Sequence, residues 1–113
     1  MADCFEKSEL TSIHRKKISY LSFGINQFGN NATVHSILPF YLKRARSILL
    51  EANGDTGYSG DIILKVSHKP EYKSAQIKKA EADLAFIEEH LANCSVNQVN
   101  EYNEIKDLLN KTK

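Results

Sequence analysis

Four histidines are the side chains of this sequence with the widest chemical repertoire, because imidazole can bind a metal, transfer a proton or carry a phosphoryl group. They are His14, His35, His68 and His90. No His-x-x-x-His or Cys-x-x-Cys spacing brings two metal ligands side by side. His35 is followed by Ser-Ile-Leu-Pro, whereas a phosphorelay histidine is usually followed by a lysine and a glycine. The sequence therefore predicts no metal site, no cofactor and no phosphotransfer, and the roles of His35 and His68 stay open.

A glycine-rich segment, EANGDTGYSGDIILKVSHKPEYK (51–73), holds three of the five glycines and several oxygen ligands. As a calcium-binding EF-hand loop counted from Asp55 it has Gly60 at position six, but Val66 stands where position twelve needs a glutamate. A phosphate-binding loop would need Gly-Lys-Ser/Thr, and a nucleophilic Ser59 would need a preceding strand. The sequence therefore predicts turns at these glycines and a protein that is not an enzyme.

Two basic runs, HRKK (14–17) and KRAR (43–46), lie on the first and second predicted helices. If these helices pack antiparallel, the two runs share one surface, where cations could contact the phosphates of DNA or RNA. The residues of this nucleic-acid alternative are Arg15, Lys16, Lys17, Lys43, Arg44 and Arg46. The same surface could bind an acidic protein or simply be solvated.

The aromatic residues indicate a different contact surface. Phe40 falls outside the apolar stripe of its predicted helix and lies near Arg44, a combination typical of an interface anchor. Tyr58, within the glycine-rich segment, is a second exposed aromatic candidate. We predict that Phe40, Arg44 and Tyr58 form the partner-binding residues.

Apolar periodicity places four helices around these candidates, at about 8–28, 32–52, 74–93 and 96–110. The second has the strongest stripe, although Pro39 interrupts it and predicts a kink or a separate first turn. Ser8, Ser74 and Ser95 are the predicted N-caps of the first, third and fourth helices. The short link between the last two helices predicts an antiparallel hairpin.

The connection 53–73 is long for a helical bundle. Ile62 to Val66 alternates with period two, which predicts a short strand or hairpin in this crossover loop. The fold class predicted is mainly α: a four-helix bundle, 1–113, with a glycine-rich loop between its second and third helices. Such a loop is either a packed connection or a binding element.

Net charge and composition further limit the classes of function that the sequence predicts. The 113 residues carry a net charge of +1, which gives no global attraction to nucleic acid or membrane. The N-terminal residues lack the apolar run of a signal peptide, and Cys4 and Cys94 have no metal spacing, so we expect a cytoplasmic protein with two free thiols.

These observations favour a small non-enzymatic protein-binding module, such as a regulator, inhibitor, immunity factor or adaptor, that acts through its helical surface. Nucleic-acid binding through the basic runs is the alternative. The broad apolar stripe of the second helix also favours a homodimer. The partner's identity stays open.

Overall fold

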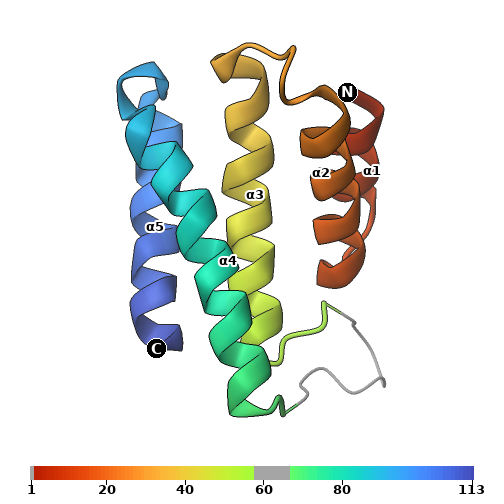
Figure 1. Ribbon diagram of the computed structural model, residues 1–113, viewed down its shortest axis with the longest axis vertical. Coiled ribbons are helices and arrows are strands. Elements are labelled where there is room, and N and C mark those ends of the chain that lie inside the picture. Colours follow the sequence, from red (N-terminus) through yellow and green to blue (C-terminus); the bar gives the residue numbers. More distant parts are fainter. Residues whose placement is uncertain (1, 58–66) are drawn as a thin grey trace.

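The computed structural model describes residues 2–57 and 67–113, which form a helical fold (Figure 1). Within those residues there are five α-helices, one 3₁₀ turn and no strand. The elements in chain order are α1 (Ala2–Leu10), α2 (His14–Phe28), α3 (Val34–Ala52), α4 (Pro70–Glu89), η1 (Leu91–Asn93) and α5 (Val96–Thr112). The predominance of helix is as predicted, but the four-helix count is wrong. The strand or hairpin predicted at 62–66 lies outside the described residues.

Helix α3 is the centre of the molecule, with α1 and α2 on one side, α5 on the other and α4 crossing it (Figure 1). Its stripe is almost fully enclosed: Leu38, Ala45 and Leu49 are 0% exposed. The main core joins this stripe to buried residues of α4 and α5. The helix runs through Pro39 as one element. Burial of the residues on both sides of the proline offsets the hydrogen bond that it removes.

The single helix predicted at 8–28 is divided into α1 and α2. Helix α1 ends at Leu10, and in the link that follows the Thr11 hydroxyl accepts a hydrogen bond of 3.2 Å from the Ile13 N–H. The His14 N–H then donates to the carbonyl of Thr56 at 3.1 Å, which fixes the start of α2 against the chain that follows α3. Ser8 lies in the last turn of α1 and donates to the Phe5 carbonyl, so it is not the predicted N-cap.

Helices α4 and α5 follow the prediction more closely. Helix α4 begins at Pro70 rather than near Ser74, because proline is well suited to the first helical turn. It ends at Glu89, and η1 forms the short link. The predicted cap of α5 is confirmed: Ser95 accepts from the Gln98 N–H, and the Gln98 side chain accepts from the Ser95 N–H.

The turn after α3 needs glycine. Gly54 and Gly57 have φ of 91° and 85°, values that side chains rarely tolerate. A Cβ on Gly57 would also overlap the carbonyl oxygen of Ser12, in the link between α1 and α2. This close approach holds the segment after α3 beside the start of α2. The two thiols, Cys4 and Cys94, are free.

Candidate functional site

A groove runs between α2 and α4 across the surface of α3. Both helices pack extensively on α3 but barely contact each other. Two hollows of about 350 and 370 Å³ lie between them and meet at Asn26 of α2, which lines both; the pair is here called the α2–α4 groove. The first hollow is lined by Ile18, Ser22, Asn26, Arg44, Ile48, Gln76, Lys79, Ala82 and Asp83. The second is lined by Ile25, Asn26, Gly29, Asn30, Ile37, Tyr41 and Phe86.

An ion pair crosses the floor of the groove. Arg44 donates from Nε to Asp83 Oδ2 at 2.8 Å and from Nη2 to Oδ1 at 2.6 Å, a bidentate geometry. The Asp83 side chain is only 4% exposed, and that of Arg44 is 18% exposed. Burial raises the pKa of Asp83 above its ordinary value, and Arg44 offsets only part of that effect. Arg44 is desolvated as well, but Asp83 outweighs this and raises the pKa of the guanidinium.

The second hollow has an aromatic wall. Tyr41 of α3 and Phe86 of α4 stack with ring centroids 3.9 Å apart and planes inclined by 15°. The Arg44 guanidinium lies over the other part of this wall, 5.3 Å from the Tyr41 ring centroid. The groove therefore joins an apolar, aromatic end to a polar middle whose internal charges are paired.

The predicted partner-binding residues do not form one surface. Phe40 is buried, 3% exposed, and packs with Leu21 and Ile37 as well as the Phe5 ring, 5.3 Å away. The prediction of an exposed anchor is therefore wrong, because α1 folds back and covers this side of α3. Arg44 lines the groove, but Asp83 holds its guanidinium. Tyr58 lies outside the described residues.

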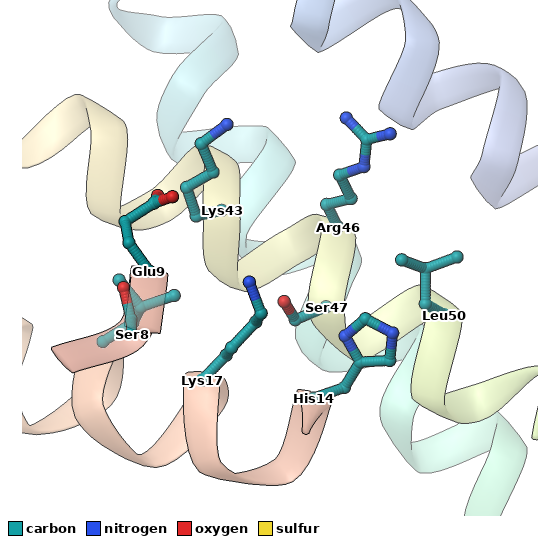
Figure 2. A pocket seen from close by; sticks show the side chains of 9 residues that line it. Ser8, Glu9, His14, Lys17, Lys43, Arg46, Ser47 and Leu50 are labelled. Carbon is teal, nitrogen blue, oxygen red and sulfur yellow. The ribbon is translucent and has the colours of Figure 1, made fainter. Parts of the chain in front are cut away.

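Half of the predicted basic residues come together. Lys17 of α2 and Lys43 and Arg46 of α3 line one pocket of about 170 Å³, here called the α2–α3 pocket (Figure 2). Its other lining residues are Ser8, Glu9, His14, Leu21, Ser47 and Leu50. The remaining basic residues diverge. Lys16 is exposed outside the pocket, and Arg15 and Arg44 are each bound to a carboxylate elsewhere.

Glu51 organises a polar cluster that the sequence did not suggest. This carboxylate is 2% exposed. It accepts from Arg15 Nε at 3.0 Å and from the Tyr72 hydroxyl at 2.6 Å, and His68 Nε2 lies 3.2 Å away. Burial, together with Glu51, raises the pKa of Tyr72. The only available signal was a glutamate within the apolar end of α3, "SILLEA".

The carboxylate oxygens of the Glu51 cluster accept hydrogen bonds from donors on α2 and α4. The cluster joins α2, the end of α3 and the start of α4. His68 belongs to this cluster, whereas His35 is exposed in the first turn of α3. Over residues 2–57 and 67–113, no group of three histidine, cysteine or acidic side chains is placed to hold a metal ion.

Comparison with known proteins gives no relative: no protein-family model, curated protein or solved structure matches the chain. Among the described residues, no helix combines the length and the apolar character needed to cross a bilayer.

Proposed function

We propose that this protein is a small non-enzymatic binding module whose α2–α4 groove receives an amphipathic helix of a partner protein. The observation that carries the proposal is the pair of adjacent hollows in the groove, which are lined by apolar side chains of three helices. Grooves of this kind bind the apolar face of a helix in many protein complexes. The free thiols of Cys4 and Cys94 support action in a reducing compartment such as the cytoplasm.

The charges of the groove define the partner's chemistry. Arg44 and Asp83 neutralise each other, and Lys79, which is exposed at the rim, is the remaining charged residue of the lining. Asn26 and Gln76 add neutral hydrogen-bonding groups along the rim. The favoured ligand is therefore a helix with an apolar stripe and an acidic residue beside Lys79.

The test blocks the groove where its two hollows meet. Asn26 is exposed and shared by both hollows, so Asn26→Arg fills the junction with little effect on the core. Asn100 is exposed on α5, away from the groove, so Asn100→Arg is a matched control with the same added charge. Wild type and both variants are used to capture partners from nuclease-treated lysate of the native host. Backbone amide shifts with the purified partner then map its contact surface.

The expected result is one stoichiometric protein that binds wild type and Asn100→Arg but is lost with Asn26→Arg, and whose contacts map to α2 and α4. Equal capture by both variants, or contacts elsewhere, overturns the assignment. If Asn26→Arg instead converts a dimer into a monomer in sedimentation, the occupant is a second copy of this chain.

Nucleic-acid binding is a second candidate, and one observation favours it: Lys17, Lys43 and Arg46 line the same pocket. It is tested by the anisotropy of labelled DNA and RNA oligonucleotides as salt is raised. Phosphate contacts predict a steep loss of affinity with salt. A flat response excludes this candidate.

A further inference from the structure

We propose that the α2–α3 pocket is a binding site for a phosphate group, supplied by inorganic phosphate or by a small phosphomonoester. The site is separate from the α2–α4 groove and does not depend on the function proposed for it. Positive side chains from two helices surround one concavity, which is the first requirement for an oxyanion site.

The lining of the pocket carries an excess of positive charge. Three cationic side chains, Lys17, Lys43 and Arg46, face one acidic residue, Glu9. Lys43 is partly neutralised by Glu101 of α5, 3.0 Å away. Lys17 and Arg46 form no ion pair with any described residue. Two cations are thus available to a ligand at one opening.

The start of α2, which contributes His14 and Lys17 to the lining, is positive as well. A helix N-terminus is the positive end of the helix dipole and normally attracts acidic residues. Helix α2 begins instead with four consecutive basic-type residues, 14–17, has no acidic residue in its first turn and has no side-chain N-cap. Asp55 lies 3.6 Å from His14 and Glu51 binds Arg15, so among the described residues the positive charge left without an acidic partner at this end of α2 is that of Lys16 and Lys17, which a bound anion would offset.

The pocket also contains a hydroxyl group that can donate a hydrogen bond. Ser47 is 5% exposed, and Figure 2 shows its hydroxyl on the same side of the pocket as the Lys17 ammonium. An apolar ligand would leave these groups unsatisfied, whereas an oxyanion accepts hydrogen bonds from lysine, arginine and serine together.

The shape of the site distinguishes a single phosphate from a nucleic acid. A volume of about 170 Å³ holds one phosphate group with a few waters. A nucleic-acid backbone needs cations at successive phosphates, yet Arg15 and Arg44 are held by Glu51 and Asp83. The Glu9 carboxylate lies on the Lys43 side of the pocket in Figure 2, and its residue is exposed, so it can turn toward solvent when an anion enters.

The experiment is a titration of ¹⁵N-labelled protein with inorganic phosphate at constant ionic strength, followed by amide shifts. Lys17→Gln and Arg46→Gln each remove one proposed ligand. Lys16→Gln is the matched control, because Lys16 lies in the same helical turn and loses the same charge but does not line the pocket. Lys17→Arg keeps the charge and the donor. Parallel titrations use phosphoserine, chloride and a single-stranded oligonucleotide.

The expected result is saturable shifts around residues 14–17 and 43–50 on titration with phosphate or phosphoserine. Lys17→Gln or Arg46→Gln should weaken binding about tenfold, because each removes a charge-assisted hydrogen bond. Lys16→Gln should weaken it less than about twofold, and Lys17→Arg should retain it. The tighter of phosphate and phosphoserine identifies the source of the phosphate group.

Three results overturn the proposal. Absence of saturation with both phosphate and phosphoserine removes the site. Equal losses of phosphate affinity in Lys16→Gln and Lys17→Gln, or equal amide shifts with chloride, would show that the anion responds to general surface charge and not to a specific site. Binding confined to the oligonucleotide replaces it with nucleic-acid recognition.

Discussion

The ion pair on the floor of the α2–α4 groove allows a quantitative test of the structure. Arg44→Met keeps most of the side-chain length but leaves the Asp83 carboxylate, 4% exposed, without its partner. Removing one member of a buried pair costs about 3 to 5 kcal/mol. The lower value applies here, because Arg44 is 18% exposed beside an open hollow that admits water. We therefore expect Arg44→Met to lower the free energy of unfolding by about 3 kcal/mol at neutral pH, which corresponds to a fall in Tm of roughly 12 °C.

The pH dependence of the stability of Arg44→Met gives a second, independent test of the buried ion pair. The pKa of Asp83 is already raised by burial, and loss of Arg44 removes the effect that opposes this rise. At pH values between the unfolded-state and folded-state pKa of Asp83, the folded variant therefore retains a proton that the unfolded chain has lost. Stability linked to this group therefore increases as pH falls from neutrality through the folded-state pKa. The difference in the free energy of unfolding between wild type and Arg44→Met should therefore be smaller at pH 5 than at pH 7.

The assay is urea unfolding of wild type, Arg44→Met, Asp83→Leu and the double variant at both pH values. Replacement of both partners by apolar residues removes the buried charge, so the double variant should be more stable than Arg44→Met. A loss below about 1 kcal/mol in Arg44→Met, with no change between the two pH values, would refute the placement of this pair.

Three further predictions concern other parts of the structure. Gly24→Ala should destabilise the fold by about 1 to 2 kcal/mol in urea unfolding, because its Cβ would lie 2.5 Å from the buried Phe40 ring and this overlap outweighs the gain in helix propensity. Stability equal to wild type would contradict that contact. Ser95→Ala should cost about 1 kcal/mol by loss of the cap of α5, whereas Ser95→Asp should cost much less. Glu51→Gln should lower the raised pKa of Tyr72 toward its ordinary value, as measured by NMR titration of ring-labelled tyrosine, and an unchanged pKa would contradict the 2.6 Å hydrogen bond.

The pattern of the sequence predicted those elements whose signals are local. The stripe of α3 and the Ser95 cap of α5 were both readable, because helical periodicity and capping depend on residues three or four positions apart. The division between α1 and α2 was not readable from the sequence, because the apolar stripe continues across residues 11–13. The bond from His14 to Thr56, 42 positions later, fixes the start of α2, and no local pattern encodes it.

The candidate sites also depend partly on the sequence and partly on tertiary packing. The sequence determined which residues are basic, aromatic or acidic, and it placed two basic runs on neighbouring helices. Only tertiary packing decided that Phe40 is buried beneath α1 and that Arg44 binds Asp83, 39 positions away. Packing also decided which cations converge. Lys17 and Arg46 come to one pocket because α2 and α3 lie side by side, whereas Arg15, two residues from Lys17, turns to Glu51.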